Sequence, residues 1–333
     1  MKTRAATVAE RLDDTQPVPE HLRGAIVAMG NFDGFHLGHQ AVVARAVAWA
    51  RSEGRPTIVA TFDPHPMRLF HPDTPPFRLT TLDQRQRLFG AASADAMLVF
   101  HFNRDLASQS AEDFIARLSA QFGAAGVVTG EDFTFGRGRS GSVAALQTLG
   151  APLGLRSEAV TPVVDSNGEV VSSSRIREAL QAGDCPLATR LLTRPFAIEG
   201  TVQHGDKIGR TLEFPTANID LGAYLRPAYG IYAVRGRLPG GRFVDGAANL
   251  GIRPTFDPPV ELLEPYFFDW SGDLYGQTIE VQLIARLRPE AKFDGIEALT
   301  AQIRRDCDEA RRVLAASPDR PGSERVEGGG HRG

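Results

Sequence analysis

A short turn rich in glycine and histidine constrains the fold of this chain more than any other stretch. It follows residues 25–29, which are all apolar and predict a buried strand, and it precedes apolar side chains at helical spacing from residue 39 onward. The turn itself, residues 30–40, contains three glycines and two histidines. In open α/β sheets, ligands bind where strands end and helices begin, so this stretch predicts an α/β fold with a ligand site at the turn.

The chemistry of the turn suits a phosphate group. The first N–H groups of a helix lack partners within the helix and carry partial positive charge. Gly34 and Gly38 let the backbone approach a ligand closely, and the rings of His36 and His39 can donate hydrogen bonds to the same anion. A metal-binding pair is disfavoured, since no cysteine or third histidine lies nearby. A turn with two solvated histidines is the remaining alternative.

Length, charge and cysteine content limit the classes of protein to which the chain can belong. Its 333 residues favour two domains over one, and its hydrophobic content of 42% is ordinary for globular chains. The formal net charge of −3 predicts no general binding to nucleic acid or to membrane surfaces. Two cysteines far apart in sequence, Cys185 and Cys307, predict a reducing compartment, and without an apolar signal core or spanning segment we expect a cytoplasmic protein. Residues 316–333 are rich in proline, glycine and charge, which predicts a disordered tail.

Strand and helix patterns alternate through the first half of the chain. The expected strands lie at residues 25–29, 57–62, 96–102, 126–130 and 155–164. The expected helices lie near residues 39–50, 82–92, 110–118, 142–149 and 172–180, with Ser110 as an N-cap. Such alternation predicts a doubly wound, Rossmann-like sheet of mostly parallel strands with right-handed crossovers.

Two further stretches of this half carry side chains suited to phosphate or planar ligands. Residues 130–139 mix aromatic side chains and glycines with two arginines; aromatic rings stack on planar ligands and arginine binds phosphate. Residues 172–174 are serines that precede Arg175 and Arg177, which places hydroxyl and guanidinium groups at a helix start. A flexible surface loop and an ordinary N-cap are the alternatives that these stretches leave open.

The order of these motifs resembles the FMN adenylyltransferase module of bacterial bifunctional FAD synthetases. The resemblance rests on residues 30–40, 62–66, 130–136 and 172–177, and the first of these contains the His-x-Gly-His pattern of nucleotidyltransferases. In that family the histidines stabilise the charge that develops on the α-phosphate of ATP as pyrophosphate leaves. The resemblance therefore implies catalysis by positioning and electrostatics, without a protein nucleophile.

The resemblance also implies roles for individual residues. It implies that His36, His39 and Arg177 are catalytic. The residues implied to bind ATP or its phosphates are Gly30, Asn31, Phe32, Gly34, Gly38, Ser172, Ser173 and Ser174. Those implied to face the flavin are Phe62, Pro64, Pro66, Asp132 and Phe135. Family members more often have a smaller residue where Phe35 stands, which bears on the width of the mouth of the site.

The second half of the chain has a different pattern, with strands separated by glycine- and proline-rich turns. The expected strands lie at residues 196–203, 216–219, 230–237, 242–249, 262–270 and 278–287, and their lengths suit a small antiparallel β-barrel. An amphipathic helix at residues 295–314 is expected to pack on the barrel through a face that includes Cys307. We therefore expect one domain at residues 22–186 and a second at residues 190–315.

Two motifs of the second half are suited to binding a nucleotide. Residues 204–210 form a glycine-bounded loop with two cations, whose backbone can wrap around phosphates. Residues 214–218 place a hydroxyl and an amide at the start of a strand, where neutral oxygens can hold Mg²⁺ or phosphate. By itself, each motif is also explained by a β-turn or by a bend before a strand.

Together with residues 246–256 and 263–276, these motifs resemble the riboflavin kinase module. The resemblance implies that Glu264 is the general base that removes the proton of the ribityl 5′-hydroxyl, a role suited to a carboxylate. It implies that Mg²⁺ is held by Thr216 and Asn218. The residues implied to bind ATP phosphates are Gly205, Lys207, Gly209, Arg210, Thr216 and Asn218.

Three residues depart from the usual pattern of this module. Family members often have glycine where Glu213 stands and Val-His where Pro265 and Tyr266 stand. Because proline lacks a backbone N–H, Pro265 predicts that the strand beside Glu264 is an edge strand or is locally bent. A solvated edge-strand carboxylate is the alternative interpretation of Glu264.

These features predict an enzyme with two active sites. We expect the barrel to phosphorylate riboflavin with MgATP, and the α/β domain to transfer the adenylyl group of a second ATP to FMN, giving FAD and pyrophosphate. The predicted partners are the small molecules riboflavin, FMN and ATP, with no nucleic acid or membrane, and the oligomeric state stays open. The alternatives are a chain in which only the adenylyltransferase works, a nucleotidyltransferase with another acceptor, and a flavin sensor without turnover.

Overall fold

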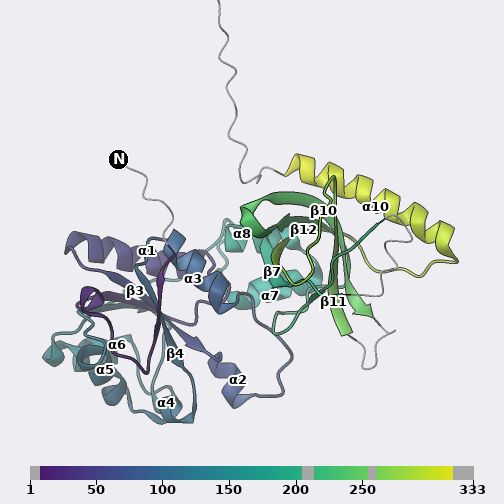
Figure 1. Cartoon of the computed structure of the whole chain (residues 1–333). Helices are drawn as coiled ribbons and strands as arrows, with labels where there is room; N and C mark the ends of the chain where they lie inside the picture. The colour runs from purple at the N-terminus through teal and green to yellow at the C-terminus, as the bar shows by residue number, and fades with distance from the viewer. Residues whose placement is uncertain (1–7, 205–213, 254–259, 318–333) are drawn as a thin grey trace, which may run out of the picture. The chain divides into compact units, whose positions relative to one another are not determined.

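The computed structural model describes residues 8–204, 214–253 and 260–317, which form two compact units, each with its own sheet (Figure 1). The first unit contains the described residues up to Glu178, together with Arg190–Arg194 and Ala223–Leu225. The second unit contains Ala179–Thr189, Pro195–Gly222 and the chain from Arg226 onward.

The first unit is built on a six-stranded sheet in the order β1-β4-β3-β2-β5-β6, in which all neighbours are parallel. Its strands are β1 (Glu10–Asp13), β2 (Ile26–Met29), β3 (Thr57–Asp63), β4 (Ala96–His101), β5 (Gly126–Gly130) and β6 (Arg156–Val160). From β2 the chain adds β3 and β4 on one side and later β5 and β6 on the other. The predicted parallel sheet is confirmed, and ligands in such sheets bind beside this reversal of strand order.

Helices cover both faces of this sheet, with α1 and α3 on one face and α5 and α6 on the other (Figure 1). The helices of the first unit are α1 (Leu37–Ser52), α2 (Pro66–Phe70), α3 (Leu82–Ala91), α4 (Arg104–Ser108), α5 (Ala111–Ala120) and α6 (Val143–Gly150), with 3-10 turns at Glu20–Leu22, Arg137–Arg139 and Ala151–Leu153. Two further helices, α7 (Ser173–Ala182) and α8 (Cys185–Leu192), each have residues in both units. Alternate residues of β2 enter opposite cores, Val27 and Met29 one of them and Ile26 and Ala28 the other. The doubly wound prediction is therefore confirmed.

A segment from the second half of the sequence belongs to the first unit. Arg78 and Tyr224 form a parallel bridge, in which the N–H of Arg78 donates to Ala223 O at 3.1 Å and the N–H of Leu225 donates to Arg78 O at 2.8 Å. Tyr224 is buried, and its hydroxyl donates to Oε1 of Gln84 in α3 at 2.8 Å. The segment Ala223–Leu225 is thus bonded to the loop before α3 and to α3 itself.

The second unit is an antiparallel sheet of six strands in the order β7-β12-β9-β10-β11-β8. Its strands are β7 (Phe196–Thr201), β8 (Ile219–Asp220), β9 (Gly230–Arg237), β10 (Phe243–Arg253), β11 (Val260–Phe267) and β12 (Thr278–Arg288), with a 3-10 turn at Pro239–Gly241. The two ends of the sheet meet where the N–H of Gln203, just past β7, donates to Asn218 O at 2.9 Å, just before β8. The sheet therefore closes on itself, and the predicted barrel is confirmed. The strand predicted at residues 216–219 is shorter in the structure, because Asn218 forms only this isolated bridge.

The last described helix, α10 (Ile296–Ala316), packs on the barrel. Cys307, Ala310 and Leu314 of this helix share a core with Ala233 and Ala247 of the strands. The predicted packing role of Cys307 is confirmed, and burial raises the pKa of its thiol to about 11. The helix includes residue 316, the first of the predicted tail, and residues 318–333 lie outside the described part of the chain.

Candidate active sites

The predicted phosphate-binding turn lies at the carboxyl end of β2, where the strand order reverses. α1 begins at Leu37 and His36 is its N-cap, because Nδ1 of His36 accepts the backbone N–H of His39 at 3.4 Å. Gly34 has a φ of +87°, and a Cβ at this position would lie 2.9 Å from Cδ1 of Leu79. The path of the turn therefore depends on glycine at position 34.

Gly34→Ala is expected to destabilise the first unit by about 1–3 kcal/mol, because alanine would be held in a left-handed conformation and pressed against Leu79. Thermal or denaturant unfolding measures the change. Gly54→Ala is the matched control, since Gly54 has a φ of +64° but no atom within 4 Å of the added Cβ. Equal losses in the two variants would contradict the importance of the close contact.

The two histidines of the turn form a stacked pair, with ring centroids 3.6 Å apart and an interplanar angle of 22°. A Cβ at Gly38 would lie 3.2 Å from the ring of His36, so glycine leaves room for the pair. Burial lowers the pKa of His36 to about 4, although Asp33 opposes the shift, and burial followed by the effect of His36 lowers the pKa of His39 well below its usual value. Both rings are therefore neutral near pH 7. Among the described residues Nδ1 of His39 has no hydrogen-bond partner, so the pair keeps capacity for an anionic ligand.

Stability is expected to fall between pH 6.5 and about pH 4, because these histidines are buried in neutral form. The unfolded chain binds a proton near pH 6.5, whereas folded His36 binds one only at about pH 4, so acid favours the unfolded state in this window. The contribution of His36 reaches about 3 kcal/mol at the acid end. Denaturant unfolding at about pH 7.5 and about pH 5 measures the loss. His36→Asn should reduce it, and an identical loss in this variant would refute the assignment to His36.

An aspartate that sequence reasoning left out, Asp33, connects the turn to the predicted arginine. Its buried carboxylate accepts the N–H groups of Leu79 and Thr80, both at 3.0 Å, and a guanidinium N–H of Arg177 at 2.8 Å. The hydroxyl of Ser173 donates to the backbone O of Asp33 at 2.9 Å. The start of α7 is therefore bonded directly to the turn. The only signal in the sequence was an acidic residue within the glycine-rich stretch.

The other members of the serine and arginine motif have different surroundings. Oγ of Ser172 accepts the N–H of Arg175 at 3.3 Å, as an N-cap would, and Ser174 is exposed. The guanidinium of Arg175 pairs with Asp165 at 2.7 Å and Glu169 at 2.6 Å. The structure thus brings Ser173 and Arg177 to the turn, while Arg175 is occupied elsewhere.

The first residues of the turn support the histidine pair. Phe32 is buried, and its ring meets that of His39 edge-on with centroids 5.2 Å apart. A Cβ at Gly30 would lie 3.2 Å from the ring of Phe32. Asn31 is exposed, and its backbone O accepts the hydroxyl of Thr61 at 2.8 Å. These contacts hold the backbone of the turn against β3.

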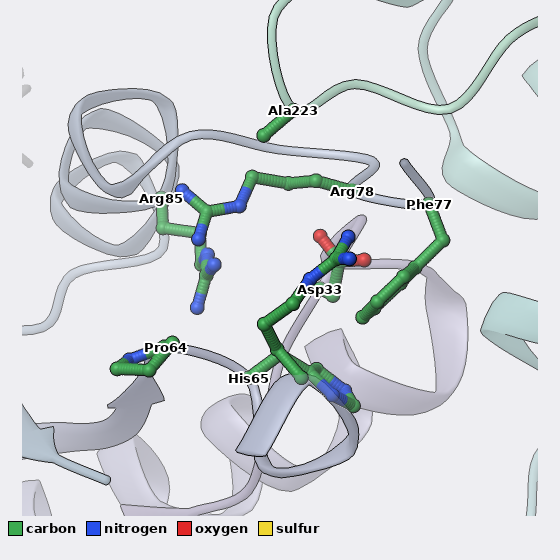
Figure 2. Close-up of a pocket in the computed structure, with 8 residues that line it drawn as sticks. Asp33, Pro64, His65, Phe77, Arg78, Arg85 and Ala223 are labelled. Atoms are coloured by element: carbon green, nitrogen blue, oxygen red, sulfur yellow. The ribbon is translucent and has the colours of Figure 1, made fainter. Parts of the chain in front are cut away.

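A pocket lies at the same edge of the sheet, with an empty volume of about 350 Å³ that includes its open mouth. Its lining residues are Asp33, Pro64, His65, Arg68, Phe77, Arg78, Arg85 and Ala223 (Figure 2). Pro64 alone of these was predicted as a site residue. The others come from the loops after β2 and β3, from α2 and α3, from the loop between these two helices, and from the segment Ala223–Leu225, so only the folded chain brings them together.

The remaining residues predicted to face the flavin do not line this pocket. Phe62 and Phe135 are 7% exposed and belong to one hydrophobic core of the first unit, where Phe62 stacks on Phe100 with centroids 5.5 Å apart. Pro66 is the first residue of α2, and Asp132 is exposed after β5. The structure therefore gathers Pro64 with the arginines, and leaves Phe62 and Phe135 packed among other aromatic rings.

The predicted general base of the second unit, Glu264, lies in β11 with 13% of its side chain exposed. It forms an ion pair with Arg253, and its Oε2 accepts the amide N–H of Asn249 at 3.4 Å. Asn249 is directly opposite Glu264 in the pairing of β10 with β11. Asn249 and Arg253 belong to the motif at residues 246–256 but were not predicted as site residues.

The predicted Mg²⁺ ligands, Thr216 and Asn218, lie beside β11, the strand that carries Glu264. The N–H of Ala217, between Thr216 and Asn218, donates to Pro265 O at 3.0 Å. β11 is paired with β10 along its length and with β8 at Leu262 and Leu263, so it is not an edge strand as a whole. The other form of the prediction, a local bend at Pro265, stays a prediction. Pro265 lies beyond the pairs with β8, where a missing N–H is tolerated. The site residues Gly205, Lys207, Gly209 and Arg210 and the departure at Glu213 lie outside the described residues.

Comparison with known proteins assigns both halves of the chain. Residues 18–175 match the family model described as FAD synthetase, and residues 192–314 match the model described as riboflavin kinase. A bifunctional riboflavin kinase/FMN adenylyltransferase from Pseudomonas fluorescens is 40% identical over 304 residues, which cover 91% of this chain and 96% of the relative. The chain belongs to the bifunctional riboflavin kinase/FMN adenylyltransferase family.

A second bifunctional relative and one solved structure are also similar to this chain. The protein of that name from Escherichia coli K12 is 38% identical over 288 residues, covering 85% of this chain and 90% of the relative. A crystal structure described as a macrolide-efflux protein from Streptococcus pneumoniae matches with a TM-score of 0.81 and 29% identity, covering 92% of this chain and 99% of that one. Within the described residues, every helix of this member of the bifunctional family is too short or too polar to cross a bilayer.

Proposed function

We propose that the chain makes FAD from riboflavin in two ATP-dependent steps, one in each domain. The kinase domain, residues 190–315, forms FMN, and the adenylyltransferase domain, residues 22–186, joins FMN to the adenylyl group of ATP. Membership of the bifunctional family supports both activities. The observation that carries the second step is the neutral histidine pair at the reversal of strand order, which suits a site for phosphates.

Adenylyl transfer in the first unit requires mainly positioning. An oxygen of the FMN phosphate attacks the α-phosphorus of ATP, and the bond from that phosphorus to pyrophosphate breaks. The rings of His36 and His39 donate N–H bonds to the α-phosphate as charge builds there. Backbone groups of the turn, with Ser172, Ser173, Ser174 and Arg177, hold the triphosphate and the departing pyrophosphate. On the flavin side we propose Phe62, Pro64, Pro66, Asp132 and Phe135.

Phosphorylation in the second unit relies on Glu264. Its carboxylate takes the proton of the ribityl 5′-hydroxyl, the hydroxyl oxygen attacks the γ-phosphorus of ATP, and ADP leaves. Asn249 and Arg253 hold the carboxylate in place, as their contacts with it suggest. The loop at residues 205–210 is proposed to hold the phosphates of ATP.

The oxygen groups of Thr216 and Asn218 fit a magnesium ion that is shared with ATP. The described residues contain no group of three histidine, cysteine, aspartate or glutamate side chains placed to hold a metal. A hydroxyl and an amide oxygen suit Mg²⁺ when phosphate oxygens and water complete its coordination. When bound, the ion neutralises charge on the transferred phosphate. Both cysteines are buried and unpaired, which supports our proposal of a reducing, cytoplasmic location.

A chromatographic time course tests the proposal. One tube contains the protein with riboflavin, ATP and Mg²⁺, and a parallel tube contains FMN in place of riboflavin. FMN followed by FAD in the first tube is the expected result. FAD from the FMN tube alone would show that the kinase is inactive, whereas flavin bound without product in either tube would support a sensor instead. β10 and β11 stay paired across Pro265, so the proline does not interrupt the strand that carries Glu264.

A further inference from the structure

The pocket of the first unit contains more positive charge than its acids neutralise. Asp33 is paired with Arg177 at 2.8 Å, and Asp63, just outside the lining, is paired with Arg78 at 2.6 Å. Arg68 and Arg85, which also line the pocket, form no ion pair with a carboxylate among the described residues. The pocket therefore carries an excess of two positive charges.

Arg85 is buried in α3 at 2% exposure, and its hydrogen-bond partners among the described residues are all neutral oxygens. Its guanidinium donates to the hydroxyl of Thr61 at 2.9 Å, to Asn31 O at 3.2 Å and to Thr80 O at 3.4 Å, and within the described part of the chain its Nε has no partner. Burial lowers the pKa of Arg85, and Arg78 adds to this effect despite the opposing charge of Asp33. A buried cation without a counter-ion is costly unless an anion joins it.

Arg68 has the same shortage of acidic partners. Its guanidinium donates to the backbone O of Pro72 at 3.1 Å and to those of Thr74 and Pro75, and it lies 5.2 Å from the centroid of the Phe77 ring. These bonds fix the loop after α2 and leave the charge uncompensated. In Figure 2 the Arg78 side chain extends from its loop toward Arg85, so the cations gather in one place.

The pocket also lies next to the turn that carries the histidine pair, which is where the phosphate of FMN has to react. Asp33 lines the pocket and lies in the turn that ends in the histidine pair, and Pro64 and His65 follow β3, the neighbour of β2. A phosphate monoester carries nearly two negative charges near pH 7, which equals the excess of the pocket. Arginine in addition offers paired N–H donors that match phosphate oxygens.

We propose that Arg68 and Arg85 bind the 5′-phosphate of FMN and orient it for attack on the α-phosphorus of ATP. This inference rests on the proposed adenylyltransferase activity. It makes the pocket the element that distinguishes FMN from riboflavin in the first unit, because riboflavin lacks the phosphate. The phosphates of ATP are the competing occupant, and kinetics separate the two.

The test uses the full chain in a Glu264→Gln background, so that added riboflavin is not consumed by the kinase. Arg85→Lys keeps the positive charge but loses the paired N–H donors of the guanidinium group. Arg68→Gln removes the positive charge at a residue of α2 that is not part of the hydrophobic core. Each variant is expected to raise the KM for FMN in FAD formation by about tenfold. The KM for ATP and the inhibition constant of riboflavin against FMN should stay within about twofold. Arg51→Gln, at an exposed arginine of α1, is the matched control.

The outcomes discriminate between the possibilities. A raised KM for ATP with an unchanged KM for FMN would assign the pocket to ATP and overturn the proposal. Unchanged constants for both substrates in Arg68→Gln and Arg85→Lys would also overturn it. Thermal unfolding identifies a variant that has lost its fold. If Arg85→Lys does not fold, Arg68→Gln alone still tests the proposal. Absence of FAD formation in the parent protein would instead reject the adenylyltransferase activity itself.

Discussion

Replacing His36 and His39 together by alanine is expected to lower FAD formation from FMN and ATP by at least about 10²- to 10³-fold. The two stacked rings are neutral near pH 7, with His36 buried and His39 half-buried, and we propose that they donate to the α-phosphate at the reversal of strand order. Riboflavin phosphorylation by the same chain should be retained, because the second unit folds around its own core. Separate assays with FMN and with riboflavin as substrate measure the two rates.

Two further variants separate catalysis from helix capping. His36→Asn keeps a side-chain acceptor for the N–H of His39, and asparagine is a good N-cap, so the start of α1 should persist while the imidazole is lost. We expect this variant to be slow but folded. His21→Ala is the control, since that histidine is exposed and pairs only with Glu10 among the described residues. A His36→Ala/His39→Ala protein that forms FAD at the normal rate would refute a catalytic role for the two histidines.

Glu264→Gln is expected to reduce the formation of FMN from riboflavin by about 10²- to 10⁴-fold. The substitution keeps the size of the side chain but removes the base, and it also removes the ion pair with Arg253. FAD formation from supplied FMN should be unaffected. Initial rates with riboflavin and with FMN give both quantities from one preparation.

The control for this variant is a carboxylate on the same strand. Glu261→Gln removes a glutamate of β11 that is bonded to Arg226 at 2.6 Å and to Tyr229, so it repeats the loss of an ion pair without touching the proposed base. It should retain most of the kinase activity. Full FMN formation by Glu264→Gln would refute the base, and an equal loss in both variants would point to a structural role for these carboxylates.

Most of the fold was predictable because apolar residues follow the period of each element. The parallel strands β2 to β6 and the barrel strands β9 to β12 lie close to their predicted positions. β1 was missed because only Leu12 of its four residues is buried, which is too short a pattern to recognise. The bridge between Arg78 and Tyr224 was missed for another reason. It joins residues far apart in sequence, and no local pattern encodes such a pair.

The candidate sites were predictable where a motif is continuous in sequence, as in the turn and in the serines before Arg177. The pocket was not, since Arg68, Arg78 and Arg85 belong to no motif in the sequence and become a cluster only through the tertiary fold. Aromatic residues posed the opposite problem, because a ring that can stack on a flavin can equally fill a core. Phe35, expected near the mouth of the site, packs on Phe89 with centroids 5.1 Å apart.

The segment Ala223–Leu225 has a consequence for evolution and for protein engineering. It lies within the stretch that matches riboflavin kinase, yet Ala223 lines the pocket of the first unit and Tyr224 is buried and bonded to Gln84 of α3. The two modules are therefore not separable by a single cut in the gene. A chimaera that exchanges kinase modules between relatives would also exchange the segment Ala223–Leu225, which supplies part of the pocket lining. A first unit expressed without the kinase module would lose this segment. We expect the residues at positions 224 and 84 to vary together among relatives that contain both modules, because their side chains are hydrogen-bonded.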